Sequence, residues 1–177
     1  VQGWMTYRTE FISNTGTAAG TSIATLVNDF NYDFETLKNF KFKIPLGKFN
    51  GGIVLPATVE GFYVGRSSQL AEEHVKAFHE VYKGIGFSGT DGLGLYEFVE
   101  CLNPSENDEL SLADEIDQQL TAVLDAVRDI PDPMSETLIS NKPIVDEAHT
   151  QMQMLVPLIK HEMTSSMSVQ INYQDND

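Results

Sequence analysis

Apolar residues in this chain recur every three or four positions over most of its length, and this spacing constrains the fold more than any other feature. A series of this kind places its members on one face of a helix, and that face must pack against a partner. Four long series follow the pattern: Ile23, Leu26, Val27, Phe30, Phe34 and Leu37; Leu70, Val75, Phe78 and Tyr82; Leu112, Ile116, Leu120, Val123, Val127 and Ile130; and Val145, Ala148, Met152, Leu155 and Ile159. The spacing therefore predicts an all-α protein, a helical bundle.

The ends of the expected helices are marked by capping residues, glycines and prolines. The predicted ranges are from Thr21 or Ser22 to about Asn39, then 67–82, 93–102, 107–130 and 143–165. The tail alternates apolar and polar residues from residue 169 to residue 173, which predicts a short extended stretch against the bundle. We expect about five helices in a single domain over residues 1–177, with a long ordered loop after the first long helix.

The charge balance excludes one class of partner. The 177-residue chain carries 26 acidic and 11 basic residues, a net charge of −15, and such a field repels a nucleic acid backbone. The sequence also predicts no transmembrane segment, because no window approaches the roughly 20 apolar residues that a membrane helix needs. Helical spacing is already present at Trp4, Tyr7 and Phe11 without an initiator methionine, so we expect a segment to precede residue 1.

Motifs of known catalytic chemistry are absent from the sequence. None of the four histidines (His74, His79, His149 and His161) belongs to an HExxH pattern, and all are expected at the surface or its boundary. His74 and His79 are five residues apart and so do not share a helix face for a metal. The single cysteine, Cys101, lies in the apolar run LYEFVECL and is expected to be buried. We therefore predict neither catalytic residues nor metal ligands within this chain.

The connection over residues 38–67 is the best candidate for a binding site, because it gathers polar groups between two rigid helices. Lys41, Lys43 and Arg66 have the chemistry to receive a carboxylate or another anion, and Glu60 has the chemistry to orient one of those bases. Tyr63 and Ser67 add neutral hydrogen-bonding groups. The alternative is purely structural: prolines and glycines shape a long loop whose charges are solvated.

Several segments of this chain resemble the second half of imelysin-like proteins. These are KNFKFKIPLG, then VEGFYVGRS, then GLGLYEFV, with WMTYRTEF at the start and VQINYQDND at the end. The resemblance implies an all-helical protein of two bundle-like halves, of which this chain is the C-terminal one. It also implies export to the bacterial periplasm or outer membrane, often as a lipoprotein, and a role in iron uptake. The family was classed as metallopeptidases for a GxHxxE motif in the upstream half, which this sequence does not contain.

Carried over position by position, the resemblance implies a ligand site between the two halves. Its residues in this chain are Lys41, Pro45, Leu46, Gly47, Glu60, Tyr63, Arg66 and Ser67. Val64 stands where the family commonly has serine, so no hydrogen bond from that hydroxyl is expected. The implied partners are the N-terminal half of the same protein and iron-uptake components of the envelope, and any iron or other divalent metal would be bound together with that half.

Three functions follow from these observations. The first is a binding component of iron uptake, in which this chain supplies one wall of the ligand site. The second is a metallopeptidase whose metal-bound water is activated from the upstream half. The third is a structural docking module, which exposed apolar residues such as Trp4 and Phe11 would favour. Because the chain lacks a catalytic motif, the sequence favours binding over catalysis.

Overall fold

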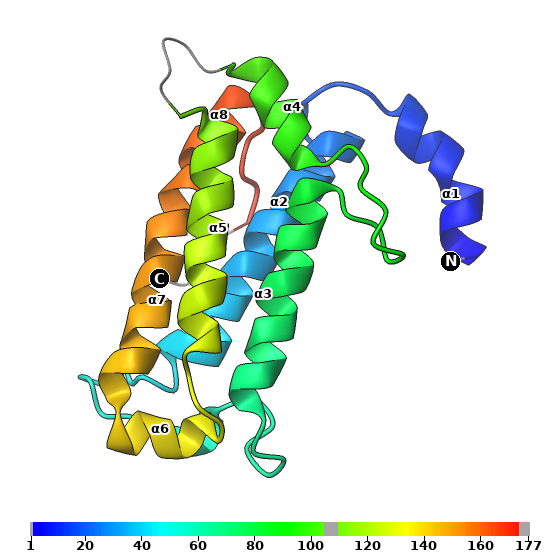
Figure 1. The fold of residues 1–177 in the computed structure, drawn as a ribbon. Coiled ribbons are helices and arrows are strands. Elements are labelled where there is room, and N and C mark those ends of the chain that lie inside the picture. The colour runs from blue at the N-terminus through cyan, green and yellow to red at the C-terminus, as the bar shows by residue number, and fades with distance from the viewer. Residues whose placement is uncertain (1, 105–109, 174–177) are drawn as a thin grey trace.

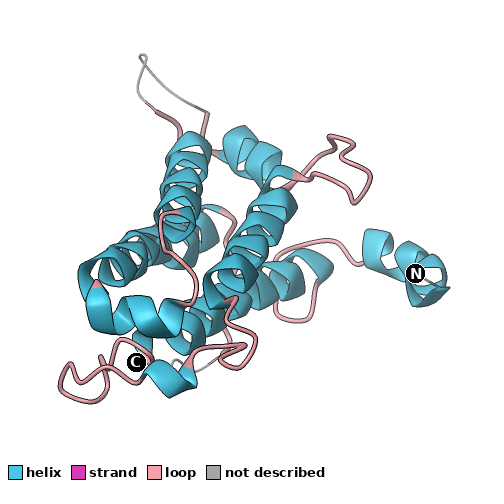
Figure 2. Ribbon diagram, turned by 60° about the horizontal axis from the view of Figure 1, so that its bottom comes forward, coloured by secondary structure: helices cyan, strands magenta, loops and turns pink. Residues whose placement is uncertain are grey.

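The computed structural model describes residues 2–104 and 110–173 and confirms the all-α class: within these ranges there is no strand (Figures 1 and 2). The α-helices are α1 (Gln2–Ser13), α2 (Ser22–Thr36), α3 (Ser67–Lys83), α4 (Leu95–Leu102), α5 (Leu112–Arg128), α6 (Met134–Ser140), α7 (Lys142–Pro157) and α8 (Thr164–Ser166). Two π-helices, η1 (Leu37–Lys43) and η3 (Leu158–Met163), continue α2 and α7, and a 3-10 turn, η2 (Pro56–Thr58), lies in the long connection.

The long helices α2, α3, α5 and α7 run side by side, with α6 across the lower end and α4 at the upper end (Figure 1). Helix α5 packs against both α3 and α7 and so forms the centre of the bundle. The predicted seams are confirmed: Ile116, Leu120, Val123 and Val127 of α5, and Val145, Ala148, Met152 and Leu155 of α7, are all fully buried. Burial of these apolar faces is the main force that stabilises the fold.

Helix α1 lies apart from the other helices in both views (Figures 1 and 2). Its aromatic side chains pack on one another instead: the rings of Trp4 and Phe11 are 5.3 Å apart, and those of Tyr7 and Phe11 are 6.1 Å apart. Trp4 and Tyr7 remain about half exposed. Among the described residues, no helix is both long and apolar enough to cross a membrane.

The end of the first long helix corrects one prediction. Instead of stopping near Asn39, α2 continues into the π-helix η1, so Lys41 and Lys43 are helical, and the irregular connection spans residues 44–66. The wider turn of a π-helix brings residues five apart onto one side. It thereby buries both Leu37 and Phe42, a spacing that the three-and-four pattern does not reveal.

Proline explains two further differences between the predicted and observed helices. Pro157 has no N–H to donate within α7, and the turn after it widens into η3, so the predicted helix over 143–165 contains a π segment. Pro131 and Pro133 end α5 as expected, but a short helix, α6, follows them and was not predicted. The observed α5 begins at Leu112 with Ser111 as its cap, whereas the predicted start, Asn107, lies outside the described residues.

Three side chains lie on a different side of their helices than predicted. Cys101 is exposed, because α4 turns Leu95 and Val99 inward and Cys101 outward. Leu70 is 43% exposed, because the inner face of α3 is formed by the neighbouring stripe that begins at Ala71. His149 is fully buried on the inner face of α7, contrary to the expected surface position.

The tail is extended along α2, as predicted. Asn28 pins it with both ends of its side chain: its Nδ2 donates to the carbonyl of Gln170 (3.0 Å), and its Oδ1 accepts from the backbone N–H of Asn172 (2.8 Å). Val169 is buried at the start of this stretch. The segment therefore closes the bundle beside α2.

Candidate functional site

The connection over residues 44–66 is held by its own backbone hydrogen bonds. The N–H of Leu46 donates to the carbonyl of Phe42 (2.9 Å), and that of Leu55 donates to the carbonyl of Pro45 (2.8 Å). At its other end, the N–H groups of Val64 and Gly65 both donate to Gly61 (2.9 and 3.0 Å). A loop whose backbone groups are satisfied in this way has a defined shape.

Pro45, Leu46 and Gly47 form the buried base of this connection. Leu46 is fully buried in the core, and Pro45 and Gly47 are buried beside it. Gly47 has φ +73°, and a Cβ at this position would lie 1.9 Å from the carbonyl oxygen of Ile53. Only glycine allows the backbone at residue 47 to pass this close to the backbone at residue 53. The three residues thus set the path of the backbone, which positions the polar residues on either side.

Lys41 and Glu60 are brought together by this path. They form an ion pair between η1 and the segment after η2, with the Lys41 side chain 14% exposed and that of Glu60 half exposed. Both line a surface hollow of about 480 Å³. Its remaining lining consists of Thr36, Leu37, Phe40, Ile44, Thr58 and His74. The hollow therefore combines an apolar floor with one desolvated cation and its partner, the arrangement typical of small-molecule sites.

Among the ionisable residues that line this hollow, His74 is the one that the sequence did not identify. Its Nε2 lies 2.9 Å from Oδ2 of Asp33, so α3 and α2 meet at the rim through this pair. His74 is distant from Lys41 in sequence, and no local pattern marks it. Only the rotation of α3 relative to η1 brings it into the lining.

The other predicted site residues lie outside the hollow's lining. Tyr63 is 99% exposed, and its ring meets only that of Phe62 edge-on, with centroids 5.2 Å apart. Arg66 is exposed, and its guanidinium forms no ion pair with any described residue. Ser67 is buried as the first residue of α3. The structure thus brings together Lys41 and Glu60 in the hollow, with Tyr63, Arg66 and Ser67 along the adjoining turn.

The N-terminus of α3 already holds an anion supplied by the chain. The backbone N–H groups of Ser68 and Gln69 donate to the two carboxylate oxygens of Asp132 at 2.8 and 3.1 Å. A carboxylate there is favoured by the helix dipole. Asp132 lies in the loop between α5 and α6, so sequence analysis of the connection did not reveal it. This contact fixes the start of α3 to the loop between α5 and α6.

A second group of polar residues lies behind η1. Lys38 pairs with Glu35 at 2.7 Å, and both of these side chains are less than a tenth exposed. Lys48 pairs with Asp146 of α7 at 2.5 Å, and both of these side chains are more than a third exposed. The ring of His149 is buried here, and neither of its nitrogens has a hydrogen-bond partner among the described residues. Burial, followed by the positive charge of Lys48, lowers the pKa of His149 to about 4. The imidazole is therefore neutral at neutral pH.

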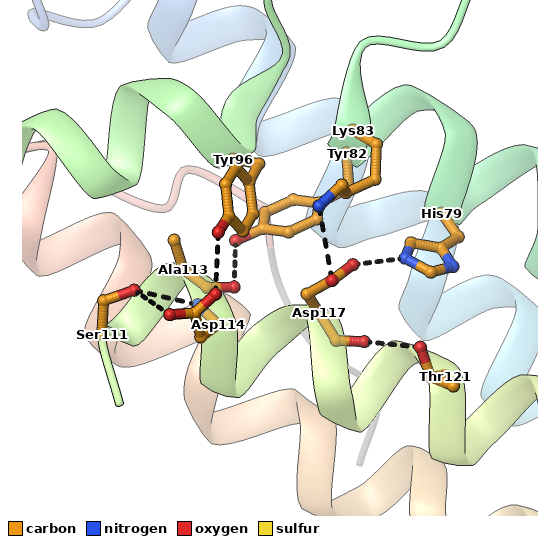
Figure 3. A network of polar contacts seen from close by, with 9 residues as sticks. All are labelled: His79, Tyr82, Lys83, Tyr96, Ser111, Ala113, Asp114, Asp117 and Thr121. Atoms are coloured by element: carbon orange, nitrogen blue, oxygen red, sulfur yellow. Dashed lines mark hydrogen bonds and ion pairs between the residues drawn. The ribbon is translucent and has the colours of Figure 1, made fainter. Parts of the chain in front are cut away.

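A polar network on the opposite side of α3 joins α3, α4 and α5 (Figure 3). Asp117 accepts from Lys83 (3.3 Å) and contacts Nε2 of His79 (2.6 Å). Tyr96 donates to Asp114 (2.7 Å), and this bond raises the pKa of Tyr96 to about 12 and lowers the pKa of Asp114. Within the network each of these side chains is engaged by a neighbour, so its arrangement is that of a structural clamp.

This clamp yields a stability prediction. Replacing Asp117 with alanine removes the partner of both His79 and Lys83, and because these side chains are partly exposed we expect a loss of about 1 kcal/mol. The matched control is Asp125→Ala, whose carboxylate is 66% exposed and 3.5 Å from Arg128. Its expected effect is below about 0.5 kcal/mol. Urea unfolding of both variants measures the difference, and equal losses would contradict the clamp.

The described residues do not form a metal site by themselves. No group of three histidine, cysteine, aspartate or glutamate side chains among them converges as metal ligands would. In the hollow, Glu60 is engaged by Lys41 and His74 by Asp33. A resident metal needs about three free ligands in one place. Over residues 2–104 and 110–173, the side chains therefore do not fit one.

Comparison with known proteins identifies one family. No curated protein and no solved structure matches the chain significantly. The model of the Imelysin family, which is classed among the peptidases, matches residues 1–159, which is most of the chain. This match agrees with the motifs of the connection and with the all-α fold. The chain belongs to the imelysin family.

Proposed function

We propose that this chain is the ligand-binding part of a bacterial iron-uptake protein located in the periplasm or at the outer membrane, and that the hollow at Lys41 and Glu60 is one wall of its ligand site. Family membership supports the general assignment. The observation that carries the site is the ion pair set on the edge of an apolar hollow of about 480 Å³. The N-terminal half of the same protein would supply the facing wall.

The hollow is suited to a small ligand that bears a carboxylate. Lys41 offers an ammonium group that is largely withdrawn from water, and its present partner, Glu60, is half exposed. An incoming carboxylate replaces Glu60 at Lys41, and Glu60 turns into solvent. A charge-assisted hydrogen bond of this kind contributes about 1.5–3 kcal/mol. Phe40 and Ile44 provide apolar contact for the rest of the ligand.

In this proposal iron is cargo and not a resident cofactor. A ferric ion held by a carboxylate chelate such as citrate presents free carboxylate oxygens, which are the groups that Lys41 binds. The chain then needs no metal ligands of its own. The metallopeptidase alternative ranks below binding, because the GxHxxE motif on which it depends does not occur in this sequence.

The test is calorimetric titration of citrate and ferric citrate into the intact protein. Lys41→Met is expected to weaken binding about tenfold, which corresponds to the loss of one charge-assisted contact. Glu60→Gln is expected to strengthen it, because the competing carboxylate is removed. Arg66→Ala should change the affinity less than Lys41→Met, since Arg66 lies outside the lining of the hollow.

The matched control is Lys76→Met, which removes an exposed lysine of α3 that takes no part in the hollow. It removes one positive charge, as Lys41→Met does, and should leave the affinity unchanged. Equal heats for the natural protein and for the Lys41 and Glu60 variants would reject the assigned site.

A further inference from the structure

Helix α3 carries a second apolar stripe that the bundle leaves uncovered. Its inner stripe is fully used: Ala71, Val75, Phe78 and Tyr82 are buried. Leu70, Ala77 and Val81 form the second stripe, at the spacing of a helix–helix seam, and all three are exposed. A seam with this spacing is suited to pack against another helix.

The facing side of α2 completes a groove. Between the two helices lies a hollow of about 290 Å³, lined mainly by Leu26, Phe30, Ala77, Phe78 and Val81. The stacked rings of Phe30 and Phe78, with centroids 3.8 Å apart, form its floor. These large rings hold the helix axes apart, so the space above them stays open. Figure 1 shows α2 and α3 side by side over most of their length.

The groove extends beyond this hollow at both ends. It shares His74 with the hollow at Lys41, and it shares Leu26 with a further hollow of about 470 Å³ next to Phe11 and Ile12. The 15 residues of α2 span roughly 22 Å at 1.5 Å per residue. The three hollows in line therefore offer an apolar track long enough for about four turns of a helix.

Both rims of the groove are acidic. Asp29 lies beside the groove residues of α2. Glu73 and Glu80 lie beside the groove residues of α3, on the side that faces away from α2. None of these three carboxylates forms an ion pair with a described residue. Within the groove, Asp33 is paired with His74. The rims thus carry carboxylates without an ion-pair partner on both sides of an apolar track, and with Lys76 between Glu73 and Glu80 the α3 rim keeps a net negative charge.

We infer that the groove between α2 and α3 binds an amphipathic helix of a partner polypeptide, with an apolar seam on one face and lysine or arginine residues on its flanks. The seam spacing of α3 and the length of the track specify a helix. The unpaired acidic rims specify basic flanks. A second copy of this chain fits poorly, because two chains of net charge −15 would repel each other.

The experiment uses a synthetic helix of about 20 residues, with leucines spaced as in a seam and lysines on both flanks. Fluorescence anisotropy of the labelled peptide with the intact protein measures binding. A second peptide with glutamate in place of each lysine keeps the same apolar seam. We expect the basic peptide to bind at least about tenfold more tightly than the acidic one, and to weaken as salt is added.

Val81→Arg places a bulky cation in the groove and is expected to weaken binding of the basic peptide by about tenfold or more. Ile139→Arg is the matched control, because it changes an equally β-branched, exposed residue on α6 and should leave binding intact. Unchanged binding in Val81→Arg, equal binding of both peptides, or self-association of the chain that Val81→Arg abolishes would each overturn the inference.

Discussion

Replacing Gly47 with alanine is expected to destabilise the protein by about 3 kcal/mol or more, the largest effect of any single methyl group in the connection. Two causes act together at this position. The backbone has φ +73°, which costs an L-residue energy, and the new Cβ would lie 1.9 Å from the carbonyl oxygen of Ile53. Because the obstacle is backbone and not a flexible side chain, the loop itself must move apart.

Gly51→Ala separates these causes. Gly51 also has a positive φ, +62°, but no heavy atom lies within 4 Å of the position of its Cβ. The Gly51→Ala variant should therefore lose only the stability that the positive φ costs an alanine, about 1 kcal/mol. Urea unfolding of the two variants gives the difference. An equal loss of stability in the Gly47 and Gly51 variants would contradict the close approach of the loop backbone at Gly47 to Ile53.

The second large effect is a loss of stability in acid that depends on His149. Burial and the nearby Lys48 hold the pKa of this histidine at about 4 in the folded protein, against 6.5 in the unfolded chain. The unfolded chain therefore takes up the proton first as the pH falls. Stability that is complete above pH 6.5 declines through the window from 6.5 to 4, by about 3 kcal/mol in all at about 1.36 kcal/mol per pKa unit.

Several charged groups face His149, and they set the sign of this effect. Lys48, Lys38 and Lys43 oppose a charge on the ring, and Asp146 favours one but does not outweigh burial. His149→Leu removes the titrating ring and is expected to flatten the stability profile between pH 4 and pH 6.5. His161→Gln, a change at an exposed histidine, should keep the acid sensitivity. Urea midpoints measured across this range test the prediction, and a profile in His149→Leu as steep as in the natural protein would contradict it.

The helical fold was predictable because its signal is local. The apolar series from Ile116 to Val127 predicts both the helix and its buried face from a few turns of sequence, and the structure confirms both. The π-helix η1 was not predictable in this way, since Phe42 is buried by a five-residue spacing that an α-helical pattern does not contain. Similarly, the sequence predicts a surface position for His149, because residue spacing does not show that a polar ring lies on the inner side of the seam.

The candidate site was predictable only in part for a related reason. Lys41 and Glu60 both lie in the connection that the sequence singled out, and the structure pairs them. His74 and Asp132 contact the same region from α3 and from the loop after α5. Their positions depend on how the helices rotate and pack, which no short stretch of sequence records. Residues distant along the chain are therefore the part of the site that required the structure.

The proposed site requires the connection after η1 to be a preformed wall that holds Lys41 and Glu60 in place. Amide hydrogen exchange tests it most directly, because the N–H groups of Leu46, Gly52 and Leu55 all donate to backbone carbonyls at 2.8 to 2.9 Å. We predict that these amides exchange at least about a hundredfold more slowly than that of Ala19, an exposed residue in the loop between α1 and α2. Exchange as fast as that of Ala19 would show a mobile loop and would contradict the proposed site.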